Sequence, residues 1–349
     1  MRYDELLAWL RLVTAPLKRH DAWALLQEHG TPQAAFAAAG VAALPVGDLR
    51  RLADAAMQWA EQPGNHLLTI RNTAYPALLG HIPDAPLLLH AQGNPALLAR
   101  PSIGVVGSRN ATHQGVANAR HFAQGLSEAG FTIVSGLALG IDAAAHMGGM
   151  AGGASTVAVV GTGIDLVYPS ANRALAQCIR ERGCIVSEFL LGTPARKGHF
   201  PVRNRIIGGL ARGVLVVEAA ARSGSLITAH SALQNGRDVF AIPGSIHAAL
   251  SKGCHELIRK GEAKLVETIG HISEEYGVTS MFSEEEILAE LSASASRLLE
   301  ALAYDPVSAD ELATRLQLDA ADTQASLLAL ELAGVVERLP GGAFQRLKR

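Results

Sequence analysis

The segment Val105–Gly115, with the sequence VVGSRNATHQG, holds the residues of this chain best suited to binding an anion. An apolar run leads into a turn at Gly107, Ser108 and Arg109 follow directly, and a helical pattern begins near His113. Small residues let backbone N–H groups approach a phosphate, and a helix N-terminus adds a partial positive charge. These features predict a phosphate-binding loop, although any parallel α/β protein needs a tight turn at such a place.

Five further apolar runs are followed by segments of similar composition. SGLALGID contains Ser135, Gly136 and Gly140, and GTGIDLVYP follows the next run. The others are SEFLLGTPARKGHFPVRNRIIGG, EAAARSGSLITAH and PGSIH. Because ligands of parallel α/β sheets bind outside the carboxyl ends of the strands, these loops are expected to converge. Several converging loops rich in Gly, Ser and Thr favour a phosphate-lined groove over coincidental turns.

Positive charge is concentrated in the middle of the chain, although the whole carries a net charge of −2. Residues 101–270 contain 16 Lys and Arg against 10 Asp and Glu, whereas residues 281–349 contain 6 against 12. No acid lies between Asp84 and Glu128, or between Glu188 and Glu218. Such long intervals without a carboxylate indicate an anionic partner.

The cations of the middle segment are spread over separate loops, which suits a chain of phosphates better than one mononucleotide. The predicted track consists of Arg109, Lys197, Arg203 and Arg205. Phe200 lies among these cations in a chain with only 5% aromatic residues, and is either a platform for a base or a core residue that anchors its loop. Asn204 is suited equally to a base and to the nucleic-acid backbone.

Enzyme motifs are weak in this sequence. It contains neither a GxxxxGK[ST] phosphate loop nor a GxGxxG motif with a ribose-binding acid at the usual distance. Ser225 and His230 lack the GxSxG setting of a hydrolase nucleophile. The cysteines, Cys178, Cys184 and Cys254, have no CxxC spacing and are interpreted as packing residues. No catalytic residue, metal ligand or cofactor is predicted.

Four ionisable residues near the predicted groove receive structural interpretations. Asp142 is expected to brace a helix start, and His146 to satisfy a loop carbonyl rather than to bind a metal. Glu188 and Glu218 stand at strand ends, where they could serve as general acid and base. Bracing of the neighbouring arginines is the preferred interpretation for both.

Apolar β-branched runs separated by helical stretches predict a doubly wound, mostly parallel sheet of the Rossmann-like α/β class. The expected strands are Ile103–Val106, Phe131–Val134, Thr156–Val160, Ile185–Ser187, Val214–Val217 and Val239–Ile242. Residues 1–75 are expected to form a helical accessory domain and residues 76–270 the sheet domain, with Leu87–His90 as an edge strand.

The acidic end of the chain predicts a separate small domain. Residues 271–287 are expected to form an acidic linker and residues 288–349 a winged-helix-like domain. Its helices are expected at Ser296–Ala303, Ser308–Leu316 and Thr323–Ala333, followed by a hairpin from Val335 to Leu347. Strong negative charge favours protein contact or regulation over tight DNA binding by this domain, and disfavours a transcription regulator.

No apolar run reaches membrane-spanning length, and the first residues carry Asp4 and Glu5 where a signal peptide would be basic. A cytoplasmic location without membrane association is therefore expected.

The assembled motifs resemble the DNA-processing protein A family, DprA or Smf. The matching pieces are VVGSR, SGLALGID with AAH, GTGIDLVYP, SEF, FPVRNRIIGGL, VVEAAARSGSLITAH and GRDVFAIPG, between about Tyr75 and Val266. The resemblance implies an extended Rossmann domain that binds single-stranded DNA, protects incoming strands and delivers them to the RecA recombinase in natural transformation. It further implies a homodimer without catalytic activity, and an N-terminal domain of the SAM or helix-hairpin-helix kind.

Carried over by motif, the family's phosphate-binding loops fall on Gly107–Arg109 and Ser135–Gly140, and its Lys-x-x-Phe element on Lys197 and Phe200. One departure is His255, where many relatives carry Asn; the resemblance places this position near the surfaces that the family uses for association. The alternative function is a nucleotide-processing enzyme that cleaves nucleoside monophosphates. It is disfavoured because SGSLITAH stands where such enzymes carry PGGxGT with a following Glu.

Overall fold

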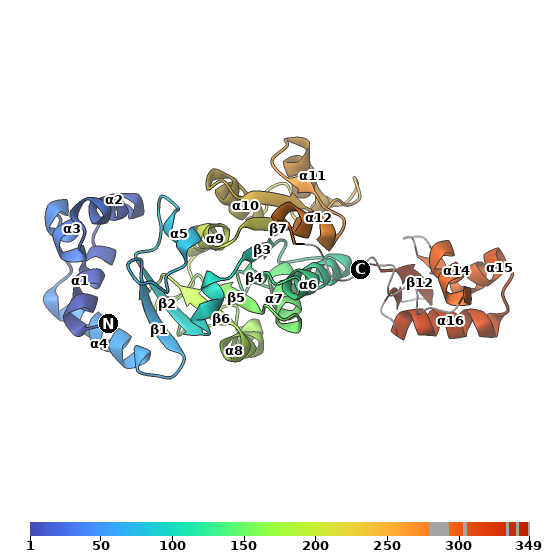
Figure 1. Ribbon diagram of the computed structural model, residues 1–349, viewed down its shortest axis with the longest axis horizontal. Helices are drawn as coiled ribbons and strands as arrows, with labels where there is room; N and C mark the ends of the chain where they lie inside the picture. The colour runs from blue at the N-terminus through green and yellow to red at the C-terminus, as the bar shows by residue number, and fades with distance from the viewer. Residues whose placement is uncertain (279–292, 303–305, 333–334, 340–341, 348–349) are drawn as a thin grey trace. The chain divides into compact units, whose positions relative to one another are not determined.

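The computed structural model describes residues 1–278, 293–302, 306–332, 335–339 and 342–347 (Figure 1). The chain divides into two compact units, Met1–Val278 and Thr279–Arg349. No helix in these ranges is both long enough and apolar enough to cross a membrane.

The first unit is built on a nine-stranded sheet with the order β1-β2-β6-β5-β4-β3-β7-β8-β9. All six expected strands are present and mutually parallel, which confirms the predicted fold class. They are β3 (Ser102–Val106), β4 (Thr132–Ser135), β5 (Thr156–Val159), β6 (Cys184–Ser187), β7 (Gly213–Val216) and β8 (Asp238–Ala241). The strand order reverses at β3, with β4 on one side and β7 on the other, so a ligand crevice is expected at the carboxyl ends of these strands.

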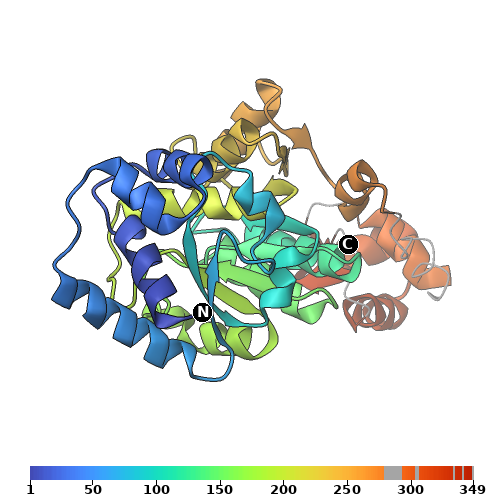
Figure 2. The same ribbon diagram turned by 60° about the vertical axis from the view of Figure 1, so that its left-hand side comes forward.

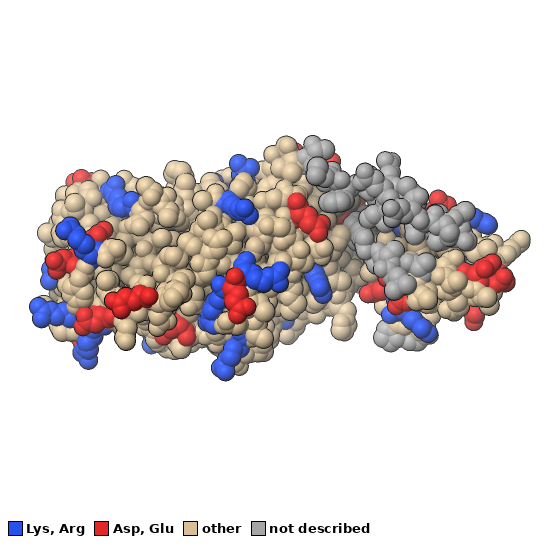
Figure 3. Space-filling model, turned by 60° about the horizontal axis from the view of Figure 1, so that its bottom comes forward, with Lys and Arg blue, Asp and Glu red and all other residues tan. Residues whose placement is uncertain are grey.

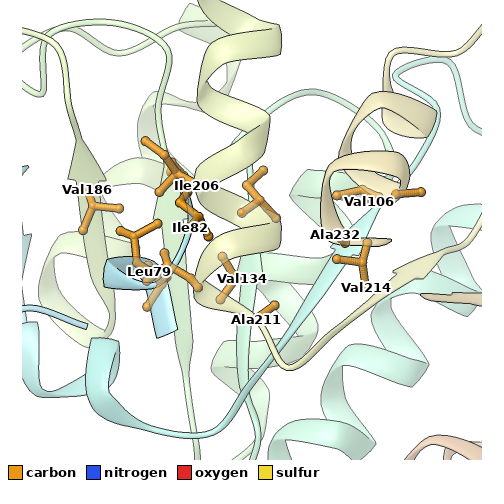
Figure 4. Close-up of a cluster of buried hydrophobic side chains, with 14 of the residues drawn as sticks. Leu79, Ile82, Val106, Val134, Val186, Ile206, Ala211, Val214 and Ala232 are labelled. Atoms are coloured by element: carbon orange, nitrogen blue, oxygen red, sulfur yellow. The ribbon is translucent and has the colours of Figure 1, made fainter. Parts of the chain in front are cut away.

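Helices cover both faces of the sheet (Figures 1 and 2). They are α6 (His113–Glu128), α7 (Ile141–Ala151), α8 (Arg173–Arg182), α9 (His199–Leu210), α10 (Ser225–Gln234), α11 (Lys252–Arg259) and α12 (Ile269–Ser273). Successive residues of β3 show the two faces, because Val106 packs with α9 and α10 whereas Val105 packs with α6 and α7. Figure 4 shows the first of these cores, in which Ile206 of α9 belongs to one cluster with Val186, Val134 and other strand residues.

Two antiparallel strands and several short elements complete the sheet domain. β2 (Leu88–Gly93) pairs with β6, and β1 (Asn65–Thr69) pairs with β2. The expectation that Leu87–His90 forms an edge strand is therefore wrong. The prolines that suggested an edge lie before the strand and leave its N–H groups free to pair on both sides. The short elements are α5 (Ala77–Gly80), β9 (Lys264–Leu265) and the 3-10 turns η1 (Pro95–Ala99), η2 (Ser170–Asn172), η3 (Ala249–Ser251) and η4 (Glu274–Tyr276).

The N-terminal segment forms α1 (Tyr3–Val13), α2 (Arg19–His29), α3 (Pro32–Ala39) and α4 (Val46–Ala60). Leu6 and Leu10 of α1 pack with Leu49 of α4 and Leu88 of β2, so the helices share a core with the sheet. The expected helical segment 1–75 also contains β1, which departs from that expectation because its pairing with β2 is a tertiary contact that local pattern does not reveal.

Residues 269–278 pack on the sheet domain. Ile269 lies against Gly125 of α6, and Ile272 is fully buried in the core that contains Phe131 and Phe240. The segment 271–278, expected to belong to an acidic linker, is thus held by apolar contacts on its inner side despite Glu274 and Glu275. The rest of the expected linker, 279–287, lies outside the described residues.

The second unit contains α14 (Ala293–Ala301), α15 (Ala309–Leu316) and α16 (Ala320–Leu332) with the strands β10 (Val307–Ser308), β11 (Val336–Arg338) and β12 (Ala343–Arg346). The strands form a sheet in the order β10-β12-β11. Leu298, Leu312, Leu327 and Phe344 meet in its core. Three helices with a β-hairpin confirm the predicted winged-helix architecture.

Candidate nucleic-acid interface

A groove of about 690 Å³ opens at the carboxyl ends of the central parallel strands. Its walls come from the loops after β3, β4, β5 and β7 and from the start of α9, as the topology predicts. Seven of the predicted site residues line it: Gly107, Ser108, Arg109, Lys197, Phe200, Arg203 and Asn204. Four do not: Ser135, Gly136, Gly140 and Arg205.

The loop after β3 is held close to its neighbours by glycine. A Cβ on Gly107 would lie 2.6 Å from Ile141 Cγ1 and 2.9 Å from the Glu218 carbonyl oxygen. Gly140 has φ +72°, and a Cβ there would lie 2.4 Å from the Ser108 carbonyl oxygen. Both positions therefore require glycine for the loops to approach. Ser135 acts behind this wall, where its buried hydroxyl donates to the Val105 carbonyl at 2.6 Å.

The N-terminus of α6 differs from the sequence interpretation, which assigned it to a phosphate. The Glu218 carboxylate accepts hydrogen bonds from the Thr112 N–H at 3.0 Å and from the Thr112 hydroxyl. The same hydroxyl oxygen caps the helix by accepting from the Gly115 N–H at 2.9 Å. Glu218 was expected to brace arginines, but it acts as an internal anion at this helix end, where the helix dipole favours negative charge.

Arg203 forms the buried floor of the groove. Its residue surface is 3% exposed, and its guanidinium lies over Gly136, where an added Cβ would be 1.3 Å from Nη1. Nη1 is 3.9 Å from the Asp142 carboxylate, and neither Nη1 nor Nε makes a hydrogen bond within the described residues. Burial lowers the pKa of Arg203 to about 10, which leaves it charged at neutral pH. A buried positive charge beneath the groove favours an anion above it.

Asp142 braces the same wall, as the sequence predicts. Its carboxylate accepts from the Ala138 N–H at 3.3 Å, just ahead of the helix that contains it. Burial raises the pKa of Asp142, while Arg203 and the Ala138 N–H act in the opposite direction.

Arg205 is two residues from Arg203 but has a different environment. It is bound to the Glu188 carboxylate, lies 3.2 Å from Asp84 Oδ2 and donates to the Asp84 carbonyl. Glu188 thus has the arginine-bracing role predicted for it. Residues two apart point to opposite sides of a helix, so α9 directs Arg203 to the groove and Arg205 to Glu188 and Asp84.

The exposed rim combines cations and aromatic rings. Arg109 Cζ lies 5.1 Å from the centre of the Phe200 ring, and Lys197 is exposed three residues before Phe200. Asn204 donates to the Gly224 carbonyl at 3.3 Å and so links α9 to the loop before α10. Sequence reasoning missed Tyr168, which also lines the groove. The signal available was an aromatic residue at the end of the glycine-rich segment GTGIDLVYP.

His146 is a buried structural residue. Its Nε2 accepts from the Leu137 N–H at 3.2 Å, and its Nδ1 lies 2.7 Å from Oγ1 of Thr156. It therefore satisfies a backbone N–H rather than the expected carbonyl, because the Thr156 hydroxyl donates to the Ile133 carbonyl and leaves Nδ1 as a donor. Burial lowers the pKa of His146 to about 3. The described residues contain no cluster of His, Cys, Asp and Glu with the geometry of a metal site.

The positive charge of the sheet domain is not spread over its whole surface. On the face shown in Figure 3, Lys and Arg side chains lie singly or in small groups among Asp and Glu. The groove instead brings Arg109, Lys197 and Arg203 together around one acid, Asp142. A local cationic site of this kind suits binding along a strand of phosphates.

The fold and the groove define a class: Rossmann-like α/β proteins with a ligand crevice at the switch point of a parallel sheet. Comparison with family models then places the chain within that class. Residues 66–277 match the model described as DNA recombination-mediator protein A, and residues 283–342 match the DprA winged helix domain. The chain belongs to the DNA recombination-mediator protein A family.

Two similar proteins together cover most of the chain. It is 52% identical over 198 residues to the DNA processing protein DprA of Streptococcus pneumoniae, a match that covers 57% of this chain and 70% of the relative. It is 38% identical over 311 residues to protein Smf of Escherichia coli K12, covering 86% and 82%.

Two solved structures share the fold. The X-ray structure of the Streptococcus pneumoniae protein aligns with a TM-score of 0.66 at 39% identity, over 79% of this chain and 98% of that one. A structure of the Helicobacter pylori DNA processing protein A, described in terms of its single-stranded DNA binding mode, aligns with a TM-score of 0.56 at 28% identity, over 61% and 95%.

Proposed function

We propose that this protein binds single-stranded DNA in the groove and acts without catalysis, protecting the strand and loading RecA recombinase onto it during natural transformation and recombination. The observation that carries the proposal is the floor of the groove. Arg203 is buried and charged there, and Arg109 and Lys197 lie on separate segments above it. Backbone phosphates are the anions that such a set of cations attracts.

The contacts of Asp142, the acid that lines the groove, favour a binding role over hydrolysis. Asp142 lies beside Arg203 and accepts from the Ala138 N–H, so its carboxylate is already engaged in supporting the wall. The competing function, cleavage of nucleoside monophosphates, needs a free carboxylate near the sugar. Incubation with nucleoside monophosphates is expected to release no base, and release that depends on Asp142 would overturn the non-enzymatic assignment.

Self-association as a homodimer is part of the proposal. β9 is an edge strand, and Leu265 at its end is 46% exposed. An apolar side chain at an open sheet edge favours contact with a second copy. Sedimentation at micromolar concentration is expected to show a dimer, which Leu265→Glu shifts toward monomer. A wild-type protein that sediments only as a monomer would contradict this part of the proposal.

Titration of a labelled oligonucleotide, single-stranded or duplex, tests the DNA site. Single strands are expected to bind more tightly, with an affinity that falls as salt rises. Arg109→Glu and Lys197→Glu should each weaken binding about tenfold on any sequence, because phosphate contacts do not distinguish bases. Arg120→Glu is the matched control, since Arg120 is exposed on α6 and does not line the groove. An equal loss of DNA affinity in all three variants would show that the groove is not the DNA-binding site.

RecA loading is tested on strands covered by single-stranded DNA-binding protein. The wild-type protein is expected to shorten the lag before RecA filaments form, and Arg109→Glu to lose this effect together with DNA binding. A lag that the wild-type protein leaves unchanged, despite normal DNA binding, would restrict the function to strand binding.

A further inference from the structure

Tyr168 is the most exposed aromatic ring of the groove. It lies in the loop after β5, and half of its residue surface is accessible, whereas Phe200 is only partly exposed. Among the large apolar side chains that are exposed in the described part of the chain, Tyr168 is the one aromatic residue. An exposed aromatic ring in a groove is available for stacking.

The loop that presents Tyr168 is held in place on both sides. The Thr162 hydroxyl donates to the Leu166 carbonyl at 2.8 Å, and the Asp165 carboxylate accepts from the Gly192 N–H at 3.0 Å. The Gly163 N–H donates to the Thr193 carbonyl at 2.9 Å. The first bond closes the loop on itself and the other two connect it to the segment after β6, so the ring is exposed on a fixed support.

Phe200, in contrast, is largely covered in the free protein. A Cβ on Gly161 would lie 3.2 Å from its Cδ1, so the backbone of that residue packs against the ring. The Arg109 guanidinium lies above the ring, 5.1 Å from its centre. A base reaches Phe200 only when the Arg109 guanidinium moves off the ring. A bound phosphate draws this guanidinium toward itself and so uncovers the ring. Tyr168 needs no such movement.

The two rings have a defined relation. Their centres are 5.7 Å apart and their planes are inclined by 38°. Bases stacked in a duplex are separated by about 3.4 Å and are parallel. Two neighbouring bases therefore cannot stay stacked on each other and also each lie flat on one of these rings. Only an unpaired strand with an opened base step fits both.

We propose that Tyr168 is a second base-binding position, which takes the unpaired base next to the one held at Phe200 while Arg109 and Lys197 hold the phosphates. This inference rests on the proposed function and adds the reason for strand selectivity. The tilted pair of rings rejects stacked, paired DNA and accepts an extended single strand.

The test compares two short oligonucleotides with the same number of phosphates, one with all its bases and one abasic throughout. Tyr168→Ala is expected to weaken binding of the normal strand about tenfold, since stacking on one aromatic ring is lost. Binding of the abasic strand should be unchanged, because its phosphate contacts remain. Tyr168→Phe should retain wild-type affinity for both. Met147→Ala is the matched surface control, since Met147 is 46% exposed on α7 and does not line the groove.

Single abasic substitutions locate the base. In the wild-type protein, two adjacent positions are expected to be sensitive. Tyr168→Ala should remove the sensitivity at one, and Phe200→Ala at its neighbour. This pattern cannot arise from a change in folding, which would weaken every strand alike.

Three results would overturn the proposal. Tyr168→Ala could bind the normal strand as tightly as wild type, which would leave the ring for a protein partner. It could weaken the normal and abasic strands equally, which would make Tyr168 a support for the phosphate loops. The wild-type protein could bind neither strand, and this result alone would also reject the proposed function.

Discussion

The groove and the layer of residues directly behind it contain the same residue types in different roles. In the groove, Arg203 keeps donors without acceptors and Lys197 is exposed. Behind it, Arg205 is paired with Glu188 and Asp84, and His146 is bonded on both ring nitrogens. Close ion pairs and hydrogen bonds stabilise the fold, whereas the cations that line the groove add positive charge where an anion would bind. The difference predicts that stability and DNA binding can be separated by mutation.

The largest expected effect is on stability, from the layer behind the groove. Arg205→Met should lower the free energy of unfolding by about 3 kcal/mol, because it leaves the buried Glu188 without its main partner. Denaturant unfolding measures the loss. The double variant with Glu188→Leu should recover part of it, since no unpaired buried charge remains. A loss below about 1 kcal/mol would mean that this ion pair does not brace α9.

The next effect is the pH dependence of stability. His146, with its pKa lowered to about 3 by burial, is neutral in the folded protein, whereas the unfolded chain binds a proton near pH 6.5. The stabilisation is therefore complete above pH 6.5 and is lost as pH falls toward the folded pKa. This proton contributes about 1.4 kcal/mol per pH unit, or about 2 kcal/mol between pH 6.5 and 5.

Unfolding curves at several pH values test this sign. His90 contributes in the same direction, because burial lowers its pKa to about 4. His146→Gln should therefore reduce the slope by about one proton without abolishing it. His29→Gln, at an exposed position, should keep the wild-type slope. An unchanged slope in His146→Gln would show that His146 is not the buried neutral base described.

The third effect belongs to the groove. Arg203→Met should weaken single-stranded DNA about tenfold through loss of a phosphate contact. Its stability cost should be smaller than that of Arg205→Met, because Asp142 has a raised pKa and takes up a proton more readily when its partner is lost. Normal DNA binding by Arg203→Met would contradict the distinction between the two regions. So would a folded Arg205→Met that loses as much DNA affinity as Arg203→Met.

The smallest effect concerns the N-terminus of α6, where Thr112 donates to the Glu218 carboxylate. Thr112→Ala should lower the free energy of unfolding by about 1 kcal/mol through loss of the helix cap, while DNA affinity stays within about twofold. Thr112→Ser should behave as wild type because it keeps the hydroxyl. A marked loss of DNA affinity in Thr112→Ala would show that the N-terminus of α6 is part of the binding site.

The sheet and the general position of the site were predictable from sequence. β-branched runs between glycine-rich segments identify the six parallel strands, and the topology then brings their following loops to one edge. The loop at Gly107–Arg109 and the element at Lys197 and Phe200 lie in the groove for this reason.

The partners of individual side chains were not predictable. Arg203 and Arg205 look equivalent in the sequence, and their separation depends on which side of α9 faces the sheet edge. Arg205 finds its second partner at Asp84, 121 positions earlier in the chain. Glu218 likewise reaches Thr112 across two neighbouring strands. Such pairings are tertiary contacts, on which spacing carries no information.

The internal carboxylate of Glu218 has a consequence for ligand competition. In dinucleotide-binding proteins the helix after the first strand of the sheet holds a pyrophosphate, and free nucleotides bind through that end. Here the corresponding helix end is filled by the protein's own side chain. A free nucleotide, with all its charge at one place, loses its best point of attachment. A polymer that distributes its contacts over several loops, as the proposed DNA strand does, keeps the rest of its contacts.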